Sequence, residues 1–206
     1  DADIVYAVTV TSKLSGSYNA ALLAAEEYME EYPDRKVFVL DSKSTGPQME
    51  LIIEKYQELI AAGKSFQDVQ LEIQHYLDRT QIWWSFESLQ NFVNTGRINA
   101  AVGFLIKTFG ICIVGTTRDG ELEPLDKIRG TDRAMKKMYE DMLKDGYDGG
   151  KVRIRHSYNE EGAKTLAGLV HKDFPGADIK VGLNRGLCGY YVEKGGVVVS
   201  FEGKRR

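Results

Sequence analysis

Cysteine is scarce in this chain, and long apolar runs are lacking. Among 206 residues only Cys112 and Cys188 are cysteines, and neither belongs to a C-x-x-C motif or to the Cys/His spacing of a zinc site. A zinc site and a disulfide framework are therefore not expected, and reduced thiols in a cytoplasmic protein are the simplest interpretation. The longest apolar stretch, near residues 100–106, is far too short to cross a bilayer, and no signal peptide is recognisable. We expect no integral membrane segment.

A marked excess of either charge is also lacking. The 27 Lys and Arg residues nearly balance the 30 Asp and Glu residues, which leaves a formal net charge of -3. A nucleic-acid-binding protein would need a concentrated basic patch, and the sole basic cluster is Lys204-Arg205-Arg206. Nucleic acid is therefore not an expected partner. The apolar share of 43% is ordinary for a globular protein, and a chain of this length can bury a sizeable core.

Signature motifs of several enzyme classes are missing as well. The sequence has no G-x-G-x-x-G, no G-x-x-x-x-G-K-[ST], no G-x-S-x-G and no H-E-x-x-H. His156 ends a predicted strand, which is a position that favours function. With no obvious nucleophile to pair with it, a structural role is the better expectation. The sequence therefore predicts a polar binding rim rather than a catalytic apparatus.

Short β-branched runs alternate with helical periodicity along the whole chain. This pattern predicts an α/β fold with two α/β domains: residues 1–96 with a largely parallel sheet, and residues 97–206 with a mixed sheet. The predicted strands are 4–10, 36–40, 81–85, 111–116, 121–128, 151–156, 178–182 and 196–201. The predicted helices are 15–31, 46–62, 66–79, 87–93, 98–109, 131–143, 160–171 and a short one near residue 190. Asp119-Gly120 between two extended runs indicates a β-hairpin.

Residues 11–17, Thr-Ser-Lys-Leu-Ser-Gly-Ser, follow the first predicted strand and open a helix. Parallel sheets place ligands outside the carboxyl ends of their strands. The hydroxyls of Thr11, Ser12, Ser15 and Ser17, with Gly16 among them, converge there at a helix N-terminus, whose free N–H groups and dipole favour an anion. Uncharged donors suit a carboxylate or a phosphate. The alternative is that Ser15 caps the helix and the other hydroxyls satisfy the turn.

Three further segments at predicted strand ends could contribute to the same anion site. Residues 41–46 repeat the Ser/Thr pattern after the second strand, although Asp41 could simply close a polar turn. Arg129 could supply a charged donor, or it could form a surface ion pair. The Asn184-Arg185 loop allows either anion contact or turn chemistry.

The segment Thr-Ser-Lys-Leu-Ser-Gly-Ser-Tyr-Asn-Ala-Ala at residues 11–21 resembles the SS-x-LSGTY-x-SA signature of the DegV family of bacterial fatty-acid-binding proteins. The resemblance continues through residues 37–46, Gly96-Arg97-Ile98, Asp119-Gly120 and Lys127-Ile128-Arg129. His156 falls where the family often has a histidine at a strand end. Ordered matches extend over nearly the whole chain, and their order and spacing are more specific than any single motif.

The resemblance implies two α/β domains with an acyl chain buried between them and its carboxylate held by hydroxyls. Some family members deliver the fatty acid to a separate kinase, which phosphorylates the carboxylate for phospholipid synthesis. The chain would then be a carrier and not an enzyme, with a long-chain fatty acid as ligand and no cofactor. The ligand-binding residues predicted in this way are Thr11, Ser12, Leu14, Ser15, Gly16, Ser17, Arg129, His156, Asn184 and Arg185.

The chain departs from the family pattern in three places. The family's N-terminal portion, with its own head-group loop, is expected upstream of Asp1. The family's I-K-P-I run is replaced by Ile-Cys-Ile-Val at residues 111–114. The G-T-H-T-G-P-G loop is replaced by residues 182–189, so that Asn184 stands where the head-group histidine would be. Asn can donate a hydrogen bond to a carboxylate but cannot carry charge, and Arg185 is the neighbour that would compensate.

Three hypotheses follow. A lipid carrier predicts an apolar tunnel, lined by Leu14, Phe92, Val93, Val102, Leu105 and Tyr190. A small-molecule phosphotransferase subunit or hydrolase on the same scaffold needs a base beside a nucleophile, and the candidates are His156 as the base with Ser12 or Ser15 as the nucleophile. An interaction module predicts no bound ligand. We favour the carrier.

Overall fold

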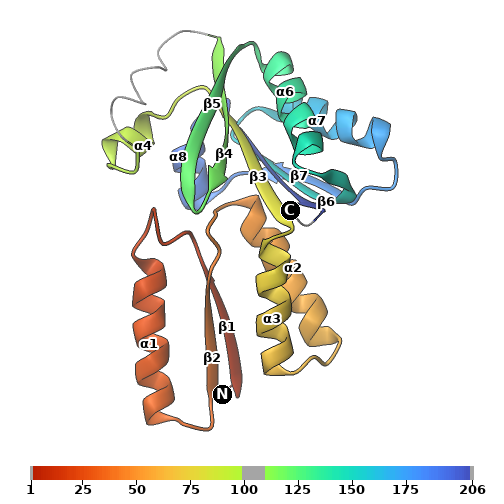
Figure 1. The fold of residues 1–206 in the computed structure, drawn as a ribbon. Helices are drawn as coiled ribbons and strands as arrows, with labels where there is room; N and C mark the ends of the chain where they lie inside the picture. The colour runs from red at the N-terminus through yellow and green to blue at the C-terminus, as the bar shows by residue number, and fades with distance from the viewer. Residues whose placement is uncertain (1, 99–109, 205–206) are drawn as a thin grey trace.

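The computed structural model describes residues 2–98 and 110–204. The helix predicted over residues 98–109, with the tunnel candidates Val102 and Leu105, falls outside the described residues except for its first position. Two sheets organise the rest of the chain (Figure 1). The smaller sheet pairs β1 (Ile4–Thr9) with β2 (Lys36–Asp41) in parallel. The larger sheet is mixed and has the order β5-β4-β3-β8-β6-β7. The predicted α/β fold, parallel first and mixed second, is confirmed.

The smaller sheet is sandwiched between helices. α1 (Ser17–Glu31) lies on one side of it, and α2 (Pro47–Ala61) and α3 (Phe66–Leu77) lie on the other (Figure 1). The α2 and α3 side holds a buried cluster that includes Leu40, Leu51 and Ile73. Because both strands run in parallel, their carboxyl ends point together toward the larger sheet. The loops that follow β1 and β2 are thereby placed at the junction of the two sheets.

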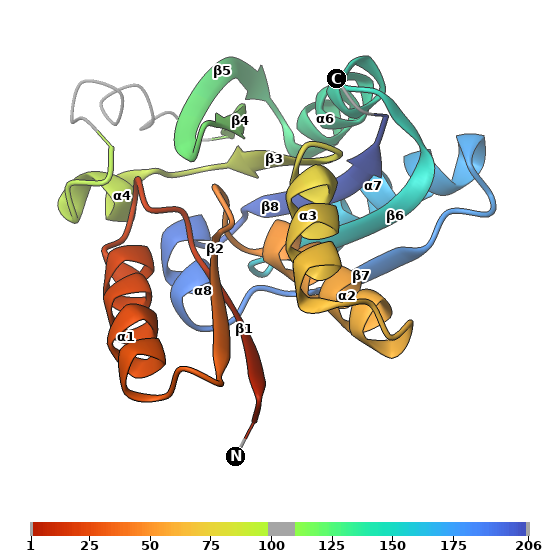
Figure 2. The ribbon, with the colours of Figure 1, turned by 60° about the horizontal axis from the view of Figure 1, so that its bottom comes forward.

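The larger sheet is built from six strands. They are β3 (Thr80–Phe86), β4 (Ile111–Arg118), β5 (Glu121–Arg129), β6 (Tyr147–His156), β7 (Ile179–Leu183) and β8 (Val197–Gly203). α6 (Thr131–Lys144) and α7 (Glu160–Asp173) cover one face of the sheet and bury the main core with it. α2 packs against β6 and β8, and the short helices α4 (Gln90–Asn94) and α8 (Gly186–Val192) lie toward the junction (Figure 2).

The strand β3 belongs to the larger sheet, not to the parallel sheet of residues 1–96 in which the sequence placed it. It pairs antiparallel with both β4 and β8. All of its side chains but one are buried, with Trp83 in one core cluster and Trp84 in another. A strand buried on both faces needs a central place in a sheet, and the two-stranded sheet has none. We therefore propose that the boundary between the two units follows the sheets, near residues 78–80, rather than the turn at residue 96.

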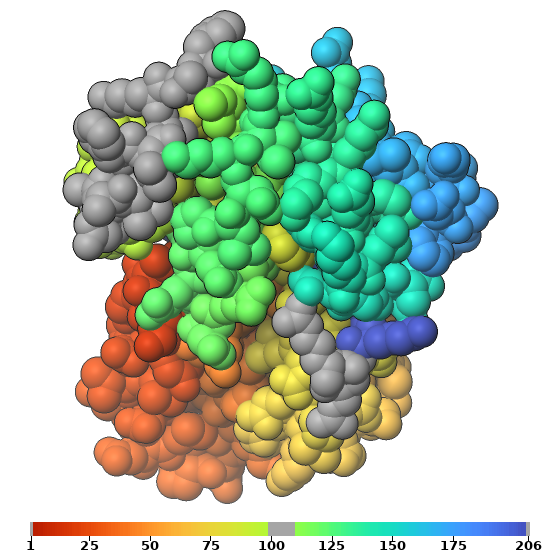
Figure 3. Space-filling model, turned by 45° about the horizontal axis from the view of Figure 1, so that its top comes forward, coloured from red at the N-terminus to blue at the C-terminus, as the bar shows by residue number. Residues whose placement is uncertain are grey.

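The β4–β5 hairpin confirms the prediction from Asp119-Gly120. Both residues have positive φ angles, 48° and 86°, as a two-residue type I′ turn requires. Arg118 pairs with Glu121 on either side of the turn. The turn carries the hairpin tip to the loop that follows β1, where the Thr11 hydroxyl donates a hydrogen bond of 3.0 Å to the Gly120 carbonyl. Figure 3 shows this hairpin, in green, reaching the red N-terminal segment.

Candidate functional site

A cavity of about 300 Å³ lies where the carboxyl ends of β1 and β2 meet the larger sheet. Val10, Thr11, Leu14 and Ser15 reach it from the loop after β1. Thr45 and Gly46 reach it from the loop after β2. Its volume is at the lower end of the range for small-molecule sites, roughly 300 to 1,000 Å³. The cavity therefore occupies the strand ends at which the sequence predicted a ligand.

One wall of the cavity is apolar and rich in aromatic rings. Four rings follow one another along it: Trp84 stacks on Phe86 at 4.6 Å between centroids, Phe86 lies 6.1 Å from Phe92, and Phe92 lies 4.6 Å from Tyr191. The aliphatic members of the lining are Val10, Leu14, Ile82, Leu122, Leu187, Val192 and Val198. A ligand that lies against this wall can bury its apolar area there and meets few polar groups. An acyl chain has the matching chemistry.

The polar part of the wall carries hydroxyls, an amide and a thiol. Its members are Thr11, Ser15, Thr45, Thr117, Asn184 and Cys188. The Thr11 hydroxyl already donates to Gly120 and accepts from the Lys13 N–H at 3.2 Å, so it holds the loop against the hairpin. The Thr117 hydroxyl is buried, and it has no hydrogen-bond partner within the described part of the chain. A buried hydroxyl without a partner is unfavourable, which marks Thr117 as a group that a ligand could satisfy.

Arg97 is a member of the wall that sequence reasoning did not select. It follows Gly96, whose φ of 71° turns the chain back after α4. Its Nε donates to the Leu14 carbonyl at 3.3 Å and its Nη1 to the Thr95 carbonyl at 2.7 Å. Neither bond uses Nη2. Of the described residues that line the cavity, Arg97 alone carries a charge. The sequence showed that Arg97 lies in a Gly-Arg-Ile turn. It did not show that this turn directs the Arg97 side chain to the cavity.

Arg129, the charged donor expected from the sequence, lies at the far end of the hairpin. It pairs with Ile111 at the start of β4, whereas the hairpin tip meets the Thr11 loop. The strand between tip and Arg129 spans roughly 25 Å. The expectation assumed that every strand ends on the ligand side. β5 is antiparallel to its neighbour, so its carboxyl end points away from the cavity.

His156 is buried, and its ring is hydrogen-bonded to the turn before α7 rather than to the Ser/Thr loop. Its Nδ1 accepts a hydrogen bond of 3.3 Å from the Asn159 N–H. Burial lowers its pKa, so the ring is neutral near pH 7. Its carbonyl accepts from the Asn184 N–H at 2.8 Å, and the Asn184 side chain donates to the Ser157 hydroxyl at 3.3 Å. His156 thus supports Asn184, which does line the cavity.

Ser12, Gly16, Ser17 and Arg185 are sequence neighbours of residues in the cavity wall but do not line it themselves. Ser12 donates its N–H to the Asp41 carboxylate at 3.1 Å, and Asp41 also closes the polar turn with the Lys43 N–H. α1 begins at Ser17, with Gly16 as its N-cap, and the Ser15 hydroxyl accepts from the Ser17 N–H. Among the described residues, the lining does not include Ser12, Gly16, Ser17, Arg129, His156 or Arg185.

Of the other apolar residues predicted for a tunnel, Leu14 and Phe92 line the cavity. Val93 and Tyr190 fall outside the described lining, and the ring of Tyr191 takes the place expected for Tyr190. Across residues 2–98 and 110–204, no helix has both the length and the apolar character needed to span a bilayer.

Comparison with known proteins gives consistent matches over nearly the whole chain. The family model described as "Uncharacterised protein, DegV family" matches residues 1–204. A curated DegV domain-containing protein of Streptococcus pneumoniae strain R6 is 36% identical over 199 residues, which cover 96% of this chain and 71% of that protein.

Two solved structures are similar to this chain in both sequence and fold. A DegV family protein from Eubacterium eligens loaded with heptadecanoic acid is 39% identical, with a TM-score of 0.95, over 99% of this chain and 74% of that one. The Fatty Acid Kinase (Fak) B3 protein of Streptococcus pneumoniae loaded with linoleic acid is 35% identical, with a TM-score of 0.95, over 98% and 73% of the two chains.

Proposed function

Because the chain belongs to the DegV family, we propose that it binds a long-chain fatty acid and carries it with the carboxylate at the polar rim of the cavity. The observation that carries this proposal is the composition of the wall: an arginine and several hydroxyls at the loops, and stacked aromatic rings along β3. A fatty acid has the same division between a charged head and an apolar tail. Burial of each CH₂ group stabilises the complex by about 0.8 kcal/mol.

The head group in this proposal is held by Arg97 together with Ser15, whose hydroxyl would turn to the carboxylate from the exposed Ser17 hydroxyl to which it donates at 3.2 Å. The Arg97 Nη2 can donate to a carboxylate oxygen while Nε and Nη1 keep the turn in place. Ser15, Thr45, Thr117 and Asn184 are the neutral groups within the same wall. Arg97 therefore takes the role that the resemblance assigned to Arg129. Thr11 contributes by fixing the loop rather than by donating its hydroxyl proton.

We further propose that catalysis belongs to a partner, a kinase that phosphorylates the presented carboxylate for phospholipid synthesis. The Fak B3 protein supports this, since its name ties it to a fatty acid kinase and it was crystallised with linoleic acid. The hydrolase alternative needs His156 to activate Ser12 or Ser15. The His156 Nδ1 instead accepts a hydrogen bond from the backbone N–H of Asn159. A cytoplasmic location, which the two free thiols favour, is part of the same proposal.

The test is native mass spectrometry of the purified protein, followed by lipid extraction. We expect wild-type protein to carry fatty acid, or to take up heptadecanoic acid when it is supplied. The double variant Arg97→Ala with Ser15→Ala should bind at least tenfold more weakly, because a charged hydrogen bond contributes about 1.5 to 3 kcal/mol. Arg133→Ala, at an exposed position on α6, is the matched control and should bind like wild type. A wild-type protein that takes up no fatty acid would contradict the proposal.

A further inference from the structure

α2 and β6 face each other with complementary charges at matching intervals. The glutamates of α2 recur at every fourth position, which places them on one face of the helix. They are Glu50, Glu54 and Glu58. The cations of β6 recur at every second position, which places them on one face of the strand. They are Lys151, Arg153 and Arg155.

Each glutamate pairs with one of these cations, in opposite chain order, and Lys151 lies in addition 3.6 Å from the Glu54 carboxylate. The pairs are Glu50 with Arg155, Glu54 with Arg153, and Glu58 with Lys151. We call these three pairs the ionic ladder. Four helix residues advance about 6 Å along the axis, and two strand residues advance about 6.6 Å. The two repeats therefore stay in step across three pairs, and long side chains absorb the small difference.

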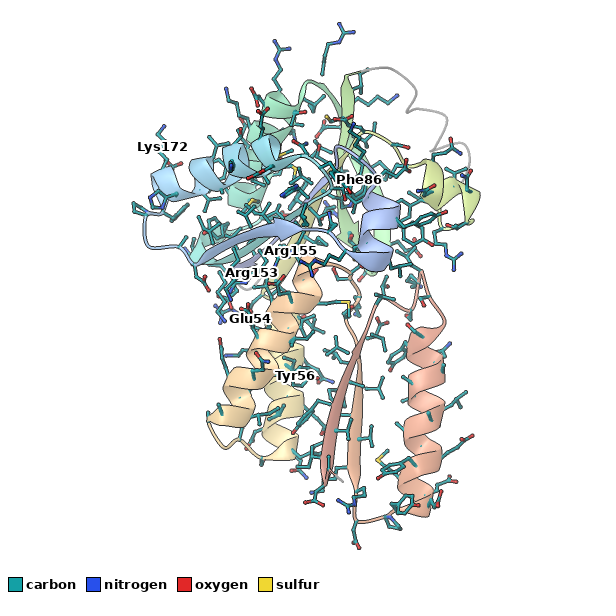
Figure 4. The ribbon with its side chains drawn as sticks, turned by 180° about the vertical axis from the view of Figure 1, so that it is seen from behind. Glu54, Tyr56, Phe86, Arg153, Arg155 and Lys172 are labelled. Atoms are coloured by element: carbon teal, nitrogen blue, oxygen red, sulfur yellow. The ribbon has the colours of Figure 1, made fainter. Side chains whose placement is uncertain are left out.

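The central pair of the ladder is the most buried. The Arg153 side chain is 0% exposed, and its Nε and Nη2 donate to the two Glu54 carboxylate oxygens at 2.9 and 2.6 Å. Nη2 also meets the Asp178 carboxylate at 2.7 Å, and Lys180 meets Glu54 at 2.9 Å. Figure 4 shows Glu54, Arg153 and Arg155 at the junction of α2 with the larger sheet. Desolvation offsets much of the attraction between the charges of a buried pair. The main effect of the pair of Glu54 with Arg153 is therefore to favour one alignment of α2 along β6.

Both elements of the ladder lead directly into the cavity wall. α2 starts at Pro47, immediately after Thr45 and Gly46. β6 ends at His156, whose carbonyl holds the Asn184 N–H at the opposite wall. The two walls touch where the Thr45 hydroxyl lies 3.7 Å from the sulfur of Cys188. The pair of Glu50 with Arg155 is the nearest in sequence to both walls.

We propose that the two pairs of the ionic ladder nearer the cavity, Glu50 with Arg155 and Glu54 with Arg153, position the ligand. They fix α2 against β6 so that the Thr45 wall and the Asn184–Cys188 wall stay closed over the bound fatty acid. Glu50, Glu54, Arg153 and Arg155 are positioning residues and do not touch the ligand. A slip of one pair would move α2 by about 6 Å along β6 and would separate the walls. This inference rests on the proposed function, because it concerns retention of the bound fatty acid.

The experiment measures release of a fluorescent long-chain fatty acid from the protein to excess serum albumin. Glu50→Gln, next to the cavity, should release it about fivefold faster than wild type, as expected for loss of one partly exposed pair. Glu58→Gln is the matched control: it is the same change on the same helix face, eight positions farther from the cavity, and its release should stay near the wild-type rate. Val170→Ala, on the buried face of α7, should lower the melting temperature without changing release.

A charge-reversed double variant tests the pairing itself. Glu50→Arg alone should release the probe faster than Glu50→Gln, because it places two cations together. Glu50→Arg combined with Arg155→Glu should return release toward the wild-type rate. If wild type binds the probe and Glu50→Gln releases it no faster than Glu58→Gln, the positioning role is wrong while the proposed function stands. If wild type binds no fatty acid, the proposed function fails and this inference fails with it.

Discussion

Single residues at the cavity show how one atom can decide what a position tolerates. Gly120 has a φ of 86°, and a Cβ built there would lie 2.2 Å from the Thr11 hydroxyl oxygen. Two separate reasons therefore require glycine at this position: the positive φ of the turn, and the close approach of the Thr11 hydroxyl. The contact joins the hairpin to the loop after β1, so the same glycine brings two parts of the cavity wall together.

Replacing Gly120 with alanine should destabilise the protein by about 3 kcal/mol, because left-handed strain and a steric clash add together. Gly63→Ala is the matched control. Gly63 also has a positive φ, 69°, but a Cβ there would meet no atom within 4 Å, so strain alone should cost about 1 kcal/mol. Urea unfolding followed by circular dichroism measures both variants. Equal losses would show that the Thr11 contact does not constrain this position.

At the scale of elements, the ladder between α2 and β6 ties stability to pH. Burial raises the pKa of Glu54, but hydrogen bonds from Arg153 and Lys180 outweigh it and lower the pKa to about 2. In the unfolded chain this carboxyl titrates near its usual 4.5. A carboxyl with a depressed folded pKa stabilises the fold above its unfolded pKa, and that stabilisation is lost as the pH falls through the folded pKa.

We therefore expect the free energy of unfolding to fall between about pH 4.5 and about pH 2, with Glu54 contributing part of the slope. Glu54→Gln should lower stability at pH 7 by about 2 kcal/mol and should flatten this acid limb. Glu58→Gln should flatten it less, since the Glu58 side chain is 48% exposed and solvent screens its pair. Thermal unfolding across this pH range is the measurement. An unchanged acid slope in Glu54→Gln would refute the assignment.

At the scale of the whole molecule, the two tryptophans report on opposite sides of the larger sheet. Trp84 lines the cavity, and its Nε1 donates to the Thr116 carbonyl at 2.9 Å. Trp83, one residue earlier, packs in the core under α6 and α7, and its Nε1 meets Asp145 at 2.8 Å. The alternation of side chains along a strand causes this separation.

Binding of a fatty acid should therefore change the fluorescence of Trp84 and leave that of Trp83 unaffected. In Trp83→Phe, titration with heptadecanoic acid should shift the remaining emission to shorter wavelength, because an acyl chain makes the surroundings of Trp84 less polar. In Trp84→Phe the emission should stay constant. The reverse pattern would place the ligand on the other face of the sheet.

Local features of the fold could be read from the sequence because their causes are local. The spacing of apolar residues distinguishes strands from helices, and Asp119-Gly120 provides the positive φ angles of a hairpin turn. The Ser/Thr loop after β1 could be predicted as part of a ligand site because it follows the end of a strand. The family resemblance added the fatty acid, which no local pattern specifies.

Pairings between distant segments could be decided only by the tertiary structure. β3 has the same apolar pattern whichever sheet receives it, and only its burial on both faces between β4 and β8 settles the choice. Arg97 and Arg129 look alike in sequence, but the direction of β5 carries Arg129 away from the cavity while the turn after α4 brings Arg97 to it. The residue types along the chain fix which chemical groups the site can use. Which of those groups meet follows from strand order and strand direction, because these depend on contacts between distant segments that no short segment contains.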